Sequence, residues 1–235
     1  MKNVLPDEFY LQADVVKVAR QLLGKVLVTH QNGIRTSGII TETEAYAGET
    51  DRASHAFGGR RTARTETMYM KGGVAYVYLC YGLHCLFNVV TNKAEIPHAV
   101  LIRGIEPVDG IEEMNRRLAL KKMKPGGNGP AKVSAALGID LNHDKATLNS
   151  TVIRIEDHAK NIAKKNIMAA PRIGVDYAGD DAQLPYRFYI QAQYACLLFD
   201  RVNPAVRAST PLSMTAAGLS VTEGMTQDDS SLHNK

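Results

Sequence analysis

The order of apolar and polar positions in the first fifty residues predicts a helix followed by a β-hairpin. In residues 14–24 an aspartate precedes apolar residues at helical spacing and a glycine follows them, which is typical of a capped helix. Residues 25–30 have the composition of a strand. Asn32-Gly33 is a strong hairpin-turn dipeptide, so we expect residues 34–46 to return antiparallel to that strand.

Alternating positions predict three further strands in the middle of the chain. Residues 74–80 and 83–91 read as two strands joined by a tight turn at residues 81–82. Residues 98–106 read as a third strand, and Pro107 is expected to end it because proline cannot donate to a sheet ladder.

The remaining segments predict surface elements around this sheet. Residues 58–73 are polar, basic and rich in glycine, which predicts a long loop with one helical turn. Residues 111–124 read as a basic surface helix, and a second helix should begin at Pro130, since proline suits the first helical position. Residues 151–156 and 187–191 read as strands.

These elements fit one mixed α+β domain over residues 1–205. Residues 206–235 are rich in Ser, Thr and Gly and carry no aromatic residue, which predicts a flexible C-terminal tail. We find no internal repeat and no clean linker.

Composition narrows the class of protein without deciding its function. Of 235 residues, 45% are hydrophobic and 22% are charged, which is ordinary for a globular protein, and the net charge of +4 permits an anionic partner without requiring one. The three cysteines form no CxxC pair, which indicates reduced thiols inside the cell. No signal peptide and no apolar run long enough for a membrane span is visible, so we expect a soluble protein of the cytoplasm or nucleus.

Two glutamates are the first candidates for chemistry. Glu42 and Glu44 are two residues apart on a predicted strand, so both side chains should point the same way, ~7 Å from each other. A solvated strand edge would explain them equally well. The following Tyr46 and glycine instead suggest a strand end that lines a cavity, where a partly desolvated carboxylate can act as a base. Alternation alone does not decide which glutamate that is.

Four tyrosines gather around the same predicted strands. Tyr46, Tyr76 and Tyr78 can be half-buried packing residues or a surface on which nucleobases stack. Tyr81 differs, because a large ring beside a glycine at a turn is placed to protrude, and a protruding ring can insert between base pairs.

Basic residues flank these aromatic strands. Arg60 and Arg64 in the long loop, and Lys132 at a helix start that exposes N–H groups, are candidates for DNA backbone phosphates, although each alone is commonly a solvated surface residue. His55 lies in a loop without an HxH or HxxxH partner, so we expect no metal site there.

Several motifs occur together in one order and spacing. They are TETEAYAG at 41–48, His55 eleven residues after Glu44, GGRRTARTETMYMKGG, AYVYLCYGLHCLFNVV, LIRGIEP, GNGPAKVSAALGI, and PRIGVDYAG followed by PYRFYI. This series closely resembles the alkyladenine (3-methyladenine) DNA glycosylase family from about residue 8 to about residue 203. The resemblance implies a single domain built around a curved antiparallel sheet, and an enzyme that needs no metal and no organic cofactor.

The resemblance also implies roles for individual residues. Glu44 matches the general base that activates water against the sugar C1′, and Arg103 matches a residue beside that water and a backbone phosphate. Tyr81 matches the side chain that enters the duplex where the damaged base has left. The base would be stacked and contacted by Tyr46, His55 and Tyr78, with its minor-groove edge read by Asn88.

The implied partner is double-stranded DNA with damaged purines, bound by a monomer in the bacterial cytoplasm or the eukaryotic nucleus. A cage of Tyr46 and Tyr78 should attract methylated purines that carry a positive charge, by ~1 to 2 kcal/mol if the site is desolvated. Departures from the family pattern are confined to loops: Lys71-Gly72-Gly73 lacks a common proline, and Ala63 replaces another.

Two other classes of protein fit parts of the pattern. A non-catalytic nucleic-acid-binding module would use the tyrosines and basic loops and be indifferent to Glu44. A carbohydrate glycosidase would use Glu42 and Glu44 as an acid and base pair, although two neighbouring carboxylates on one strand are poorly placed to flank a bond.

Overall fold

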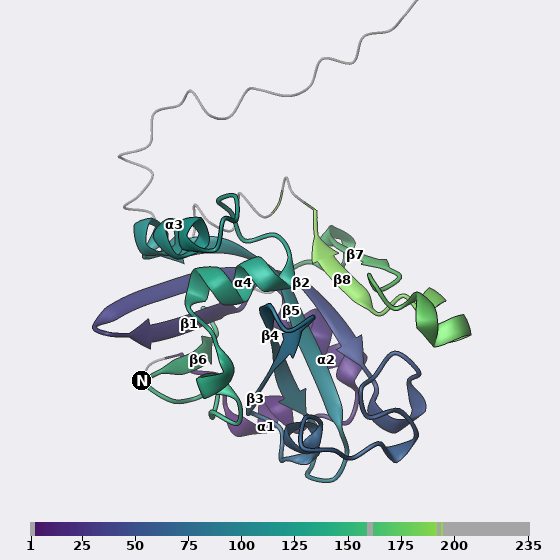
Figure 1. Ribbon diagram of the computed structural model, residues 1–235. Helices are drawn as coiled ribbons and strands as arrows, with labels where there is room; N and C mark the ends of the chain where they lie inside the picture. The colour runs from purple at the N-terminus through teal and green to yellow at the C-terminus, as the bar shows by residue number, and fades with distance from the viewer. Residues whose placement is uncertain (1–2, 159–161, 192–193, 195–235) are drawn as a thin grey trace, which may run out of the picture.

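The sheet is organised around one long strand, β2 (Ile34–Tyr46). In the computed structural model, which describes residues 3–158, 162–191 and 194, β2 pairs with β1 (Val26–Gln31) on one side and β5 (His98–Asp109) on the other. Bulges interrupt the pairing of β2 with β5 around residues 37–38 and 40–43. Such bulges bend a strand, and the sheet is visibly curved (Figure 1).

All strand pairs are antiparallel, and the order across the main sheet is β3-β4-β5-β2-β1-β6. The other strands are β3 (Ala75–Cys80), β4 (His84–Thr91), β6 (Ile153–Glu156), β7 (Ile167–Ala170) and β8 (Arg187–Ile190). Strand β8 pairs with β7 and with residues 42–44 of β2, beyond the residues that β1 covers. The predicted α+β class with a curved antiparallel sheet is confirmed.

Both predicted tight turns join the expected strands. Asn32 and Gly33 connect β1 to β2 with φ angles of 51° and 78°. Tyr81 and Gly82 lie between β3 and β4 with φ angles of 51° and 69°. Positive φ at both positions matches the twist of the flanking strands, which is why asparagine and glycine are favoured there.

Short helices surround the sheet. The α-helices are α1 (Asp7–Tyr10), α2 (Val15–Leu22), α3 (Ile111–Leu120) and α4 (Pro130–Leu137). The 3₁₀ segments are η1 (Gly48–Thr50), η2 (Phe57–Gly59), η3 (Glu66–Tyr69), η4 (Leu141–His143), η5 (Lys164–Asn166) and η6 (Asp176–Gln183). Asp14 caps α2 by accepting from the Lys17 N–H, as predicted. The Thr43 hydroxyl donates to the Ala19 carbonyl at 3.0 Å and fastens α2 to β2.

Two predicted boundaries are wrong. Strand β5 continues through Pro107 to Asp109, because Pro107 lies opposite Gly38 beside a bulge, where a missing N–H is tolerated. Helix α3 ends at Leu120 instead of residue 124, since Lys122 has a φ of 55° and cannot continue a right-handed helix.

Six short elements were not predicted at all: α1, β7, η1, η4, η5 and η6. The predicted tail at 206–235 and Cys196 lie outside the described residues. No helix of the described chain is long and apolar enough to cross a membrane.

Candidate active site

Glu44 lies in the middle of the sheet with its side chain fully buried. On β2 it sits between Leu101 of β5 and Arg187 of β8, so strands cover both edges of the backbone at this residue. Burying a carboxylate is costly unless hydrogen-bond donors surround it. The partners of Glu44 therefore define the site.

Three donors from three parts of the chain reach the Glu44 carboxylate. The Tyr46 hydroxyl donates to Oε2 at 2.9 Å, and Arg103 Nη1 donates to the same oxygen at 3.3 Å. The Ile173 backbone N–H donates to Oε1 at 2.8 Å. Burial raises the pKa of Glu44, whereas Arg103, the Ile173 N–H and the Tyr46 hydroxyl oppose the rise by stabilising the charged form. The arrangement is that of a desolvated carboxylate with raised proton affinity.

Glu42 has a different environment from Glu44. Its Oε1 accepts from Arg187 at 2.9 Å and lies 3.6 Å from Arg103 Nε, which makes no hydrogen bond within the described chain. Both glutamates therefore face Arg103, as the two-residue spacing predicted. Glu42 keeps 21% of its side chain exposed and Glu44 none, which distinguishes a solvated ion-pair member from a desolvated one.

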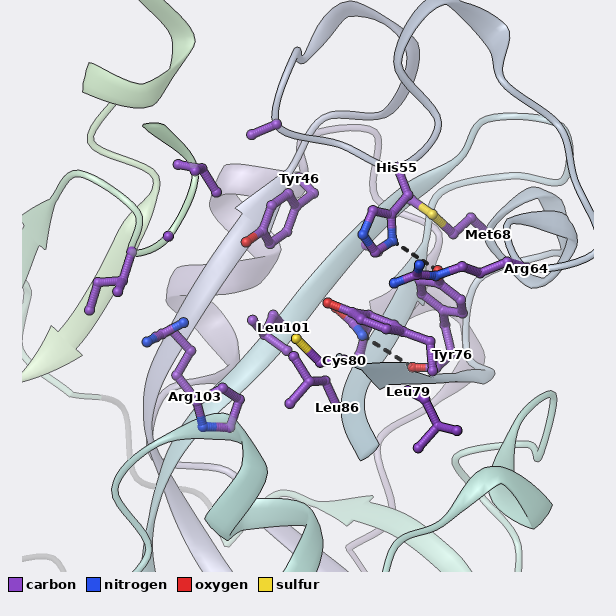
Figure 2. Close-up of a pocket in the computed structure, with 18 of the residues that line it drawn as sticks. Tyr46, His55, Arg64, Met68, Tyr76, Leu79, Cys80, Leu86, Leu101 and Arg103 are labelled. Atoms are coloured by element: carbon purple, nitrogen blue, oxygen red, sulfur yellow. Dashed lines mark hydrogen bonds between the residues drawn. The ribbon is translucent and has the colours of Figure 1, made fainter. Parts of the chain in front are cut away.

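A cavity of about 450 Å³ opens beside these groups. Figure 2 shows Tyr46 and Arg103 on one side of it, and His55, Arg64 and Tyr76 on the other. Its volume lies within the range of small-molecule sites. Glu44 does not itself line this cavity, but its three hydrogen-bond donors, Tyr46, Arg103 and Ile173, all do.

Aromatic side chains form the wall opposite Tyr46. The rings of His55 and Tyr78 meet edge to face with centroids 4.7 Å apart, and the rings of Tyr76 and Tyr78 lie 5.3 Å apart. His55 Nδ1 is 3.0 Å from the Tyr76 hydroxyl. Burial, reinforced by Arg64 and Arg60, lowers the pKa of His55 to about 4, so the imidazole is neutral at pH 7. Asn88 lines the cavity and is held by its amide donating to the Tyr76 carbonyl at 3.2 Å.

Both tyrosines proposed as an electron-rich cage already contact a guanidinium. Arg172 lies 4.9 Å from the Tyr46 ring centroid, and Arg64 lies 4.5 Å from that of Tyr78. Arg172 is buried and paired with Asp51, whereas Arg64 belongs to an exposed loop position. The rings are therefore less available to a second cation than the sequence suggested.

Three of the residues predicted to contact DNA outside the base site differ in their exposure. Tyr81 is 93% exposed at the β3–β4 turn and still lines the cavity, and Leu83 beside it is 73% exposed. Arg60 is exposed, and Lys132 is half-buried in the first turn of α4. The Gly129 N–H donates to the Arg103 carbonyl at 2.8 Å, which fixes the start of α4 beside Arg103.

Sequence reasoning missed the segment around residues 171–177. It supplies the Ile173 N–H, the buried Arg172, and Tyr177, which lines the cavity and donates to the Ala53 carbonyl at 3.1 Å. The motif PRIGVDYAG was the available signal, but nothing in its residue types indicated contact with Glu44. In the part of the chain that the structure describes, no group of three or more His, Cys, Asp or Glu side chains could hold a metal ion.

Comparison with known proteins identifies relatives over most of the chain. The family model described as methylpurine-DNA glycosylase (MPG) matches residues 8–194, a range that contains every candidate site residue. A Chlamydia abortus protein named "Putative 3-methyladenine DNA glycosylase" is 48% identical over 189 residues, which is 80% of this chain and 98% of that protein. Proteins of the same name from Bacillus cereus and Clostridium perfringens are 45% and 44% identical, over 79% and 78% of this chain and 95% and 94% of theirs.

Breaking the buried Arg172–Asp51 pair should strongly destabilise the protein. Arg172 Nη2 donates to Asp51 Oδ1 at 2.8 Å, and the Asp51 side chain also accepts the Ala47 and Ala53 N–H groups at 3.0 Å. We expect Asp51→Ala to lower the free energy of unfolding in urea by about 3 to 5 kcal/mol, because it leaves a buried guanidinium unpaired. The control Asp180→Ala, at an exposed position, should change it by less than about 0.5 kcal/mol. Equal effects of the two variants would contradict this role.

Proposed function

The chain belongs to the methylpurine-DNA glycosylase family, and from this premise we propose that it is a DNA repair enzyme that excises alkylated purines, with deaminated purines as a second class of substrate. One observation carries the catalytic assignment: a fully buried carboxylate, Glu44, adjoins an aromatic cavity through three donors. The names of the relatives support the substrate class.

The reacting sugar carbon is hidden in stacked DNA, so the damaged nucleotide must first leave the helix. Unstacking costs a few kcal/mol and is easiest at damaged or mispaired bases. We assign Tyr81 to fill the vacated space, because its ring is 93% exposed at a turn where even a side chain added at the neighbouring Gly82 would meet open space. The extruded base then enters the cavity.

Hydrolysis follows from one oriented water. Water attacks C1′ and gives a proton to Glu44, the C1′–N9 bond breaks, and its electron pair leaves with the purine. The negative charge of Glu44 stabilises the positive charge that develops on the sugar, and Arg103 helps to hold the water and the carboxylate. No lysine is assigned as a nucleophile, so the product is an abasic site in an uncut strand, which makes the enzyme monofunctional.

The cavity walls suit a flat purine. Tyr46 is assigned to one face of the base and His55 with Tyr78 to the other. Tyr46 and His55 lie on opposite sides of the cavity in Figure 2, and the Tyr78 ring contacts the His55 ring. A neutral His55 can accept or donate one hydrogen bond without adding charge. Asn88 is assigned to the minor-groove edge of the base, where it disfavours the extra amino group of guanine.

The remaining contacts are with the DNA backbone. Arg60 and Lys132 are assigned to phosphates, and the first turn of α4 adds N–H groups that favour an anion. Binding should therefore weaken as salt rises. We propose that the protein acts as a monomer on double-stranded DNA inside the cell, and the bacterial sources of the relatives favour the cytoplasm.

Replacing Glu44 tests the proposed chemistry. With a duplex that contains one 7-methylguanine or one hypoxanthine, the wild-type protein should create an alkali-labile abasic site. Glu44→Gln should keep binding to the duplex and lose about 10²-fold or more in single-turnover excision rate, because its base is gone. Glu42→Gln is the matched control on the same strand and should lose far less. A binding-only module would give no abasic site with any variant, and a Glu44→Gln rate near that of wild type would remove Glu44 from the mechanism.

The dependence of the excision rate on pH should reflect the ionisation of the Glu44 carboxyl group. The rate should fall as pH decreases through the raised pKa of Glu44, because protonation removes the base. Arg103→Gln should move this limb to higher pH, since Arg103 lowers the pKa, and Glu42→Gln should move it to lower pH, since Glu42 raises the pKa. Rate profiles measured with saturating enzyme check both shifts. If the pH at which the rate falls is the same in both variants as in the wild-type protein, the ionising group is not Glu44.

Removing the ring of Tyr81 should impair capture of the extruded nucleotide. We expect Tyr81→Ser to reduce the fluorescence change of a 2-aminopurine placed next to the lesion and to slow excision, because nothing then fills the gap. Tyr81→Phe keeps the ring and should behave like wild type. An unchanged fluorescence signal in Tyr81→Ser would disprove the insertion role.

A further inference from the structure

Arg64 contributes a positive charge to the cavity that no carboxylate neutralises. Its guanidinium lies 4.5 Å from the centroid of the Tyr78 ring, and its side chain lines the cavity beside His55 (Figure 2). Within the described residues no Asp or Glu lies at ion-pair distance from it, and Glu66, two residues further along the chain, is paired with Arg61. Arg172, at the other tyrosine, is by contrast neutralised by Asp51.

The charge of Arg64 acts on several walls of the cavity. It contributes to the lowered pKa of His55, after burial, and opposes the burial-induced rise in the pKa of Tyr76 and Tyr78. Protonation of His55 would place a positive charge inside this cavity, and burial together with Arg64 and Arg60 disfavours it. A purine that carries a positive charge would meet the same repulsion if it stacked between Tyr46 and His55.

We propose that Arg64 is a specificity-determining residue, whose guanidinium over Tyr78 assists the departure of neutral purines and disfavours the entry of cationic ones. The proposal rests on the proposed excision of purines from DNA. It assigns Arg64 to the base rather than to a backbone phosphate.

The two substrate classes differ in the charge of the leaving group. When C1′–N9 of a neutral purine such as hypoxanthine breaks, the electron pair stays on the purine, which leaves as an anion and later takes a proton from solvent. A nearby guanidinium stabilises that developing negative charge, and it does so without giving up a proton because arginine stays protonated. Glu44 still receives the proton of the attacking water.

A cationic purine needs no such help. In 7-methylguanine the same electron pair neutralises the ring, so the purine leaves uncharged. Before bond cleavage, however, Arg64 repels the positive charge of 7-methylguanine. The Tyr78 ring is also less able to attract that charge, because it already contacts the Arg64 guanidinium. The same side chain therefore acts in opposite directions on the two classes.

The test compares two lesions in three variants of the full chain. Single-turnover excision rates are measured with saturating enzyme on duplexes that contain one hypoxanthine or one 7-methylguanine. Arg64→Gln should slow hypoxanthine excision by about tenfold and leave 7-methylguanine excision unchanged or faster, because only the anionic leaving group loses a stabilising charge. Arg64→Lys keeps the charge and should retain most of the wild-type ratio of the two rates.

Arg60→Gln is the matched control for a general electrostatic effect. Arg60 lies in the same loop but does not line the cavity beside Glu44, so Arg60→Gln should weaken binding to both duplexes by a similar factor and leave the ratio of the two excision rates unchanged. Equal losses for both lesions in Arg64→Gln, with a melting temperature like that of wild type, would overturn the proposal and indicate a phosphate contact. A wild-type protein that excises neither lesion would instead refute the proposed function before any variant is compared.

Discussion

The burial of one carboxylate determines how the rest of the site is arranged. A fully buried carboxyl group such as Glu44 is tolerable only because donors from β2, from β5 and from the segment at residue 173 converge on its two oxygens. β5 and β8 pair with β2 on its two edges at Glu44, and the start of α4 is hydrogen-bonded to the backbone of Arg103, one of those donors. Reactivity and stability are coupled here, since the same contacts that satisfy the carboxylate also determine its affinity for protons.

The sequence predicted local backbone geometry well where turn residues, or the alternation of side chains along a strand, determine that geometry. Asn32-Gly33 and the glycine beside Tyr81 specify turns through backbone φ alone, so neither depends on distant residues. The two-residue spacing of Glu42 and Glu44 correctly predicted that both side chains point the same way, and in the structure both lie near Arg103. The difference between them arises from Arg187 and Ile173, which come from far along the chain, and no local pattern encodes such contacts.

The family resemblance located the candidate residues, but not the charges around them. It brought together Tyr46, His55 and Tyr78, which the structure places around one cavity. It did not indicate that guanidinium groups contact both tyrosines, because the conformation of the loop that carries Arg64 and the burial of Arg172 depend on tertiary packing. An aromatic residue in a sequence indicates a flat surface, whereas its affinity for cations depends on what already covers it.

The pairing of β8 with β2 has a consequence for biosynthesis. Ile173 and Glu44 are 129 residues apart in sequence, and Arg187 and Glu42 are 145 apart. A nascent chain therefore contains Glu44 long before it contains Ile173 and Arg187, which surround the two glutamates in the folded protein. Contacts of such long range form late and slowly, so the donors around Glu44 are complete only after most of the chain has been synthesised.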